Sequence, residues 1–215
     1  MRPFPFAALL LAFALLPAFA FGGPRVVDGD TLELNGTIYR LNGIDAPEHG
    51  QTCGDWACGV AATSALAEMV KGRDVTCDPI SEDGYGRIIA TCFVEGRDIG
   101  AEMIDKGLAW AFVRYSDVYV PEELVSKEKA AGVFTDRFQP PWEYRAQQWK
   151  RAEAQEQEAP LGCPIKGNIS RNGRIYHAPW SPWYGRTHIN ERKGERWFCS
   201  EAEALAAGWR APYWN

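Results

Sequence analysis

The stretch from Val26 to Glu48 reads V-V-D-G-D-T-L-E-L, then a short polar break, then Y-R-L-N-G-I-D-A-P-E. Both apolar runs have the length and composition of β-strands, and the Asn35-Gly36 dipeptide between them is typical of a tight hairpin turn. Both runs carry acidic residues, and these are Asp28, Asp30, Asp45 and Glu48. A hairpin over this stretch therefore brings four carboxylates toward one pole of a sheet.

A guanidinium is set among these carboxylates, because Arg40 lies in the second run. Hard divalent cations prefer carboxylate and carbonyl oxygens, and phosphates match the fork of an arginine. The combination predicts a metal-assisted phosphoryl-transfer site. The alternative is that the acidic residues only mark turns. It weakens because a later motif, D-G-Y-G-R from Asp83 to Arg87, adds a second arginine.

Four motifs together carry a family resemblance: V-D-G-D-T, R-L-x-G-I-D-A-P-E, Y-G-R and G-L-A-W-A-F-V-R-Y. In this order and spacing the chain resembles the staphylococcal nuclease, or thermonuclease, family over about Arg25 to Trp149. The resemblance implies a five-stranded barrel of the oligonucleotide-binding type, flanked by three helices. It also implies a calcium-dependent endonuclease, a hydrolase that cleaves the phosphodiester bonds of DNA and RNA.

The resemblance assigns a metal site to the first two motifs. Calcium is expected on the carboxylates of Asp30 and Asp45 and on the backbone carbonyl of Ala46, where the family often has Thr. Glu48 matches the residue that positions or deprotonates the attacking water. The alternative for each residue is an ordinary turn or surface charge.

The resemblance also assigns the substrate contacts. Arg40 and Arg87 match the two arginines that hold the scissile phosphate, and Tyr85 and Tyr115 match positions that contact a terminal phosphate and a base. A stacking tyrosine tolerates any base, which suits a nuclease of low selectivity. Phe112 departs from the family, which often has a second Tyr there.

The rest of this region alternates strands and helices. Apolar spacing predicts helices at 59–70, 99–106 and 121–131, and turn signals bound two further strands at 75–80 and 87–94. Asp98 is placed to cap the second helix. Strands followed by mixed strands and helices indicate the α+β class.

The N-terminus predicts export. Residues 1–20 hold one positive charge, a short apolar run and a small-x-small site, the pattern of a secretory signal peptide. An uncleaved anchor is the alternative. Once the signal is removed, no stable membrane span is expected, and the protein is expected to be periplasmic or secreted. Because the formal net charge is −5, DNA and RNA are expected to bind in a local basic cleft and not by overall charge. The protein is expected to be a monomer.

Six cysteines follow the signal peptide, namely Cys53, Cys58, Cys77, Cys92, Cys163 and Cys199. Disulfides are their expected state in an exported protein, although the sequence alone allows fifteen pairings. The first two could close a loop before a helix, and the next two could join neighbouring strands. The last two would then be left to pair with each other. Zinc is the rival use, disfavoured because no C-x-x-C occurs.

A change of composition divides the chain into a barrel domain at 25–150, a polar linker at 151–162 and a small C-terminal module at 163–215. The module is rich in Trp and Tyr, carries eight Lys and Arg against four Glu, and looks like a module often attached to exported bacterial nucleases. Ser200 and Glu203 predict a capping box there. A disulfide staple is expected because so short a segment buries little core.

Three functions compete. The first is the exported endonuclease, the second a catalytically inactive nucleic-acid-binding protein on the same fold, and the third an envelope interaction protein that acts through its aromatic module. The joint presence of Asp30, Arg40, Asp45, Glu48 and Arg87 favours the enzyme.

Overall fold

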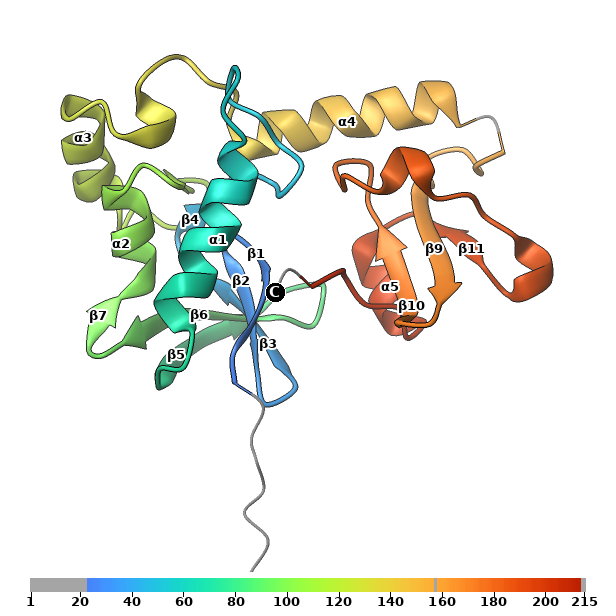
Figure 1. The fold of residues 1–215 in the computed structure, drawn as a ribbon, viewed down its shortest axis with the longest axis horizontal. Helices are drawn as coiled ribbons and strands as arrows, with labels where there is room; N and C mark the ends of the chain where they lie inside the picture. Colours follow the sequence, from blue (N-terminus) through green and yellow to red (C-terminus); the bar gives the residue numbers. More distant parts are fainter. Residues whose placement is uncertain (1–22, 157, 214–215) are drawn as a thin grey trace, which may run out of the picture.

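The computed structural model describes residues 23–156 and 158–213, so the predicted signal peptide at 1–20 lies outside the described residues. Figure 1 shows two bodies joined by a long helix. One body holds the first strands and helices of the chain, which we call the barrel. The other is the C-terminal module, whose last residues return to the barrel.

The barrel is built on strands in the order β1-β2-β3-β6-β5, with β7 paired to β6 and a separate pair β4-β8. Their bounds are β1 Arg25–Asp28, β2 Thr31–Leu34, β3 Thr37–Leu41, β4 Ile44–Asp45, β5 Val75–Glu82, β6 Ile88–Val94, β7 Arg97–Asp98 and β8 Trp110–Ala111. The predicted hairpin is present: Leu34 pairs with Thr37 across a turn in which Asn35 and Gly36 both have positive φ. Strand β3 runs parallel to β6, and the other pairs are antiparallel.

Three helices flank the sheet close to their predicted positions, at α1 Cys58–Val70, α2 Ile99–Asp105 and α3 Val120–Glu128. The carboxylate of Asp98 caps α2 by accepting the N–H of Ala101. Helix α3 is shorter than expected: it ends before Ala130, whose φ of 47° lies in the left-handed region. A short 3-10 helix, η1 Gly132–Phe134, follows. The α+β class is confirmed.

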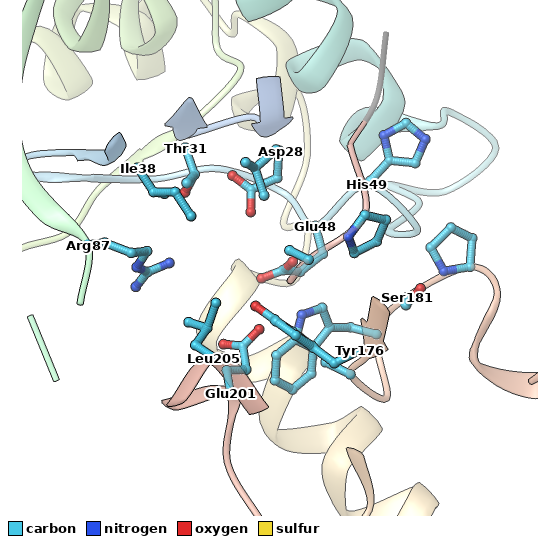
Figure 2. Close-up of a pocket in the computed structure, with 16 residues that line it drawn as sticks. Asp28, Thr31, Ile38, Glu48, His49, Arg87, Tyr176, Ser181, Glu201 and Leu205 are labelled. Carbon is cyan, nitrogen blue, oxygen red and sulfur yellow. The ribbon is translucent and has the colours of Figure 1, made fainter. Parts of the chain in front are cut away.

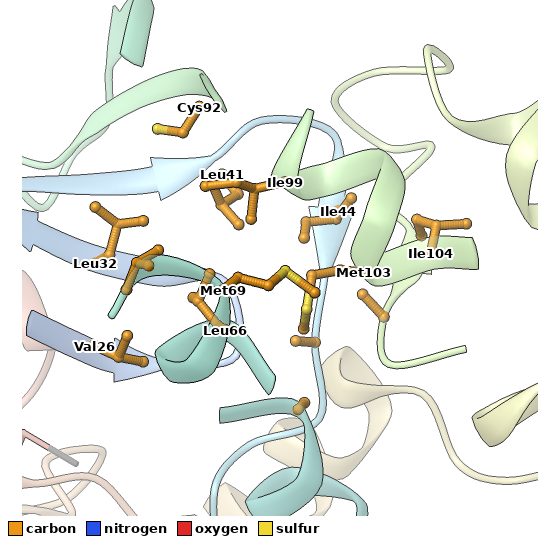
Figure 3. Packing of buried hydrophobic residues seen from close by; sticks show 14 of the residues in the cluster. Val26, Leu32, Leu41, Ile44, Leu66, Met69, Cys92, Ile99, Met103 and Ile104 are labelled. Atoms are coloured by element: carbon orange, nitrogen blue, oxygen red, sulfur yellow. The ribbon is translucent and has the colours of Figure 1, made fainter. Parts of the chain in front are cut away.

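The barrel core fills the space between sheet and helices (Figure 3). Leu32, Leu66, Met103 and Ile104 are fully buried there. Burying a side chain of this size contributes about 1.5–3 kcal/mol. This packing fixes the hairpin against α1 and so sets the frame for the acidic residues at its end.

Helix α4, Pro141–Gln155, connects the barrel to the module. The module has a three-stranded sheet in the order β10-β9-β11 and one short helix. Its elements are β9 Ile165–Ser170, β10 Gly173–His177, η2 Tyr184–Arg186, η3 Glu191–Lys193, β11 Arg196–Phe198 and α5 Glu201–Ala206. A separate cluster around Ile165, Phe198 and Trp209 forms its core.

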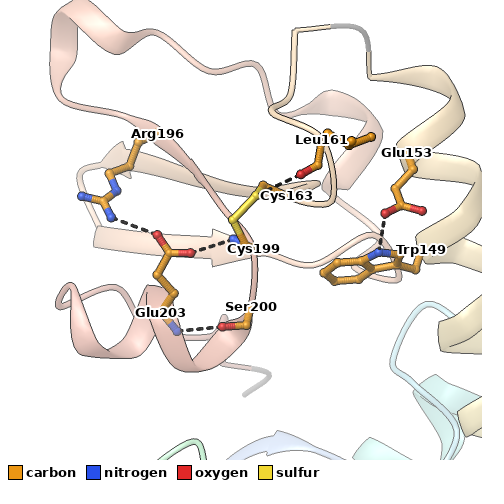
Figure 4. Close-up of a disulfide and its surroundings, with 8 residues drawn as sticks. All are labelled: Trp149, Glu153, Leu161, Cys163, Arg196, Cys199, Ser200 and Glu203. Carbon is orange, nitrogen blue, oxygen red and sulfur yellow. Dashed lines mark hydrogen bonds and ion pairs between the residues drawn. A yellow bond between two sulfur atoms is a disulfide. The ribbon is translucent and has the colours of Figure 1, made fainter.

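The cap of α5 differs in detail from the expected box. The Ser200 hydroxyl accepts the N–H of Glu203 at 3.1 Å, as predicted. The Glu203 carboxylate, however, accepts the N–H of Cys199 instead of that of Ser200, at 2.8 Å. Cys199 also forms the disulfide with Cys163, one residue before the cap (Figure 4).

The cysteines form the three favoured pairs, Cys53–Cys58, Cys77–Cys92 and Cys163–Cys199. The last of these joins the segment before β9 to the residue that follows β11 (Figure 4). Among the described residues, no helix is long and apolar enough to cross a membrane.

We predict that the module disulfide stabilises more than the loop disulfide. The first closes a separation of 36 residues and the second one of only 5, and the chain-entropy model gives about 4 against about 2 kcal/mol. Urea unfolding of the Cys163→Ser/Cys199→Ser and Cys53→Ser/Cys58→Ser variants measures both losses. Equal losses would contradict the prediction.

Candidate active site

A cleft of about 580 Å³ opens at the pole of the barrel where the acidic residues gather. Seven of the eight residues predicted from the sequence line it, namely Asp30, Arg40, Ala46, Glu48, Tyr85, Arg87 and Tyr115. The eighth, Asp45, is fully buried and pairs with Arg40. The structure therefore brings together residues that the sequence spreads over more than eighty positions.

The hairpin register places the first carboxylates against an arginine. Thr31 pairs with Arg40 across β2 and β3, so the guanidinium forms ion pairs with both Asp30 and Asp45. Asp30 also accepts the N–H of Ala46 at 2.9 Å and the hydroxyl of Thr31 at 2.9 Å. The strand register and the ion pairs therefore both hold Arg40 beside Asp30 and Asp45.

The start of α1 passes very close to the loop that carries Glu48. A Cβ atom at Gly59 would collide with the carbonyl oxygen of Glu48, so only glycine lets the helix approach so closely. The adjacent loop is clipped by Cys53–Cys58. Both features hold the backbone of Glu48 in place.

An arginine that sequence reasoning missed completes the acidic cluster. Arg145 of α4 donates to both oxygens of Asp45, at 3.0 and 2.8 Å, and to Glu48 at 2.8 Å. It lies 100 residues from Asp45 in the chain, within a helix whose sequence reads only as polar. No local signal marks it as part of the site.

Charge crowding changes the protonation of the cluster. Burial, followed by the charges of Asp30 and Glu48, raises the pKa of Asp28 well above its usual value. Burial also raises the pKa of Glu48 to about 7, although Arg145 works against the rise. Burial favours a higher pKa for Asp30 too, but Arg40 outweighs it and lowers the pKa. Asp28 and Glu48 are therefore shifted toward their protonated forms, whereas Asp30 stays ionised beside Arg40.

The donor set suits a hard cation. Within the described part of the chain, no three His, Cys, Asp or Glu side chains gather as a metal cluster. Asp30, Asp45 and the carbonyl of Ala46 nevertheless offer only oxygen atoms, the ligands that calcium prefers. Arg145 binds both oxygens of Asp45 in this structure, so a cation at this carboxylate would have to share it with that guanidinium or displace it.

Arg87 is aimed into the cleft by the turn before it. The carboxylate of Asp83 accepts the backbone N–H groups of Tyr85 and Arg87 and binds the Arg87 Nε at 2.7 Å. The guanidinium also lies over the Tyr85 ring, 5.0 Å from its centroid. This arrangement leaves the other nitrogens of Arg87 free to face a phosphate.

Aromatic side chains form the rim. Tyr115 is 70% exposed and meets the Phe112 ring edge-on at 4.9 Å. Phe112 stacks on Trp142 of α4, with 5.5 Å between centroids and 13° between planes. Where the family often has a second Tyr, this chain builds a stacked pair instead.

The module also reaches the site, which sequence reasoning missed. Trp180 and Glu201 line the cleft, and a second cavity of about 80 Å³ lies between module and barrel. In Figure 2, Tyr176 and Glu201 of the module face Glu48 and Arg87 of the barrel. The barrel alone does not enclose the cleft.

Two family models match different parts of the chain. The family model described as "Staphylococcal nuclease homologue" matches residues 38–133, and a model described as "ArfC" matches residues 144–211.

Several relatives match between about half and two thirds of the chain. Protein ParB of Escherichia coli is 32% identical over 67% of this chain and 88% of its own length. Micrococcal nuclease of Shigella flexneri is 32% identical over 65% of this chain and 89% of its own. Succinoglycan biosynthesis protein ExoI of Rhizobium meliloti is 36% identical over 55% of this chain, and the match spans only 65% of that relative.

Replacing Arg145 should destabilise the protein. Arg145→Ala leaves Asp45, which is fully buried, and Glu48 without their shared partner, and breaking a buried ion pair costs about 3–5 kcal/mol. We expect a loss near the lower bound because the Arg145 side chain is 25% exposed. Urea unfolding in chelator measures it.

Arg151→Ala is the matched control, since Arg151 lies on the same helix and is exposed. It should change the free energy of unfolding by less than about 0.5 kcal/mol. If both variants unfold alike, Arg145 does not hold the cluster.

Proposed function

This chain belongs to the staphylococcal nuclease family, and on that premise we propose that it is an exported, calcium-dependent endonuclease of DNA and RNA. The observation that carries the proposal is the meeting of Glu48, Arg40 and Arg87 beside Asp30 in one cleft. A phosphodiester bound there would lie between a proton acceptor and two guanidiniums. The inactive binding protein and the envelope interaction protein are the alternatives, and neither needs this set of groups.

The residues of the cleft divide the work. Calcium, held by Asp30, Asp45 and the Ala46 carbonyl, would supply positive charge beside the scissile phosphate when bound. Glu48 accepts a proton from the attacking water, a task for which a pKa of about 7 is well matched. Arg40 and Arg87 neutralise the charge that develops on the equatorial oxygens.

Export is supported by the cysteines. All three disulfides are of the kind that persists in an oxidising compartment. We propose a periplasmic or secreted location on that ground, together with the N-terminal sequence pattern. The module has a hydrophobic cluster separate from the two clusters of the barrel, which supports the division into a barrel at 25–150 and a module at 163–215. Helix α4 runs through Gln155 and so crosses the proposed start of the linker at 151.

Calcium dependence can be tested directly. Nucleic-acid zymography should show cleavage with calcium, none in excess chelator, and recovery when calcium is added back. The reason is that the cation would supply positive charge that the attack on the phosphate requires. Undiminished cleavage in chelator would rule out the calcium mechanism.

Loss of either phosphate-binding arginine should lower turnover. Arg87→Ala and Arg40→Ala each remove a donor to the developing charge, worth about 3–4 kcal/mol, so kcat should fall by about two to three orders of magnitude. Arg97→Ala, at an exposed arginine outside the cleft, is the control. Circular dichroism must show each variant folded, because Arg40 also pairs with buried Asp30 and Asp45. Near-normal turnover in a folded variant would contradict the assigned role.

A further inference from the structure

The C-terminal module forms one wall of the proposed nuclease cleft. Trp180 and Glu201 line both the cleft and the smaller cavity beside it. Both spaces also share Asp28, Glu48 and Arg87 of the barrel. A nucleic-acid strand bound at Arg87 would therefore contact side chains of both the barrel and the module (Figure 2).

The module is docked at separate points on the barrel. A Cβ atom at Gly50 would lie 2.8 Å from the carbonyl oxygen of Trp180, so the two backbones touch where only glycine fits. The Tyr213 hydroxyl donates to Glu33 of β2 at 2.5 Å. Trp149 of α4 packs against Trp180 with 6.4 Å between ring centroids. These contacts make the wall part of the fold.

The two walls together have the features of a single-strand site. On the barrel side, the Phe112–Trp142 stack and exposed Tyr115 lie beside Arg114. Trp180 supplies an aromatic group on the module side. Sites for single strands combine positive charge with aromatic groups on which bases stack. A volume of about 580 Å³ falls within the roughly 300–1,000 Å³ of pockets for small ligands, so it suits a short length of one strand.

Glu201 adds a negative charge to the module side of the cleft, where it acts against the binding of a phosphate. It is the first residue of α5, directly after the Ser200 cap and two residues after the Cys199 disulfide, so its backbone is held firmly. Its charge acts on Arg87, whose Nε is already bound to Asp83. Glu201 therefore competes with phosphate for the attraction of the same guanidinium.

We propose that the C-terminal module completes the substrate site: Trp180 stacks on a base of a single nucleic-acid strand, and Glu201 weakens the hold of Arg87 on its phosphate. The inference rests on the proposed function, since it assumes that nucleic acid enters this cleft. It predicts opposite effects for two substitutions in the same module.

Binding of a fluorescently labelled single-stranded oligonucleotide to the full chain, followed by anisotropy in excess chelator, tests the proposal without cleavage. Trp180→Ala should raise Kd by about five- to hundredfold, the range expected when one stacked base is lost. Glu201→Gln should lower Kd by about two- to fivefold, because a repulsive charge is removed at the rim. Trp180→Phe should recover most of the affinity, since an aromatic face remains.

Trp197→Ala is the matched control: Trp197 belongs to the module but lines a different cavity, with His188 and Arg192. It should leave Kd unchanged. The proposal is overturned if Trp180→Ala binds as wild type, if Trp180→Phe binds as weakly as Trp180→Ala, or if Glu201→Gln weakens binding. The proposed nuclease function is judged separately, by zymography of wild type. If zymography shows no cleavage but the variants change Kd as expected, the nuclease function is wrong and the role of the module in binding is retained.

Discussion

Compensation of buried negative charge is the constraint on which this structure depends. Asp28, Asp30, Asp45 and Glu48 meet at one pole, and isolated carboxylates are costly to bury. Arg40 reaches them from the neighbouring strand, and Arg145 reaches them from a helix far along the chain. The hairpin register and the path of α4 are therefore tied to the same cluster.

Local patterns predicted the helices and strands, and the resemblance of four motifs to the family supplied the candidate site residues. The Asn35-Gly36 turn, the Asp98 cap and the periodicity of α1 each act over a few residues, and each is present. The acidic motif could be recognised because its residues lie within one hairpin. Arg145, Trp180 and Glu201 could not be recognised, since they reach the cleft only through tertiary packing of α4 and the module. The sequence around them carries no period or motif that points to the barrel.

The basic residues of the module differ in their surroundings. Lys166 is buried and forms an ion pair with Glu156 at 2.7 Å. Arg196 pairs with Glu203, and Arg210 donates to the carbonyl oxygen of Asn172. The charged side chain that the module contributes to the lining of the cleft is acidic, namely Glu201. Where charges lie therefore matters more here than how many there are.

The return of the chain end to the barrel affects the order in which the protein can be completed. The Tyr213–Glu33 hydrogen bond spans 180 residues and the Arg145–Asp45 pair spans 100. Contacts between such distant positions form late in folding, because a long loop must close first. A growing chain that ends before α4 still has Asp45 without Arg145. The wall formed by Trp180 and Glu201 can join the cleft only after the module has been synthesised, because both residues follow the barrel and α4 in the chain.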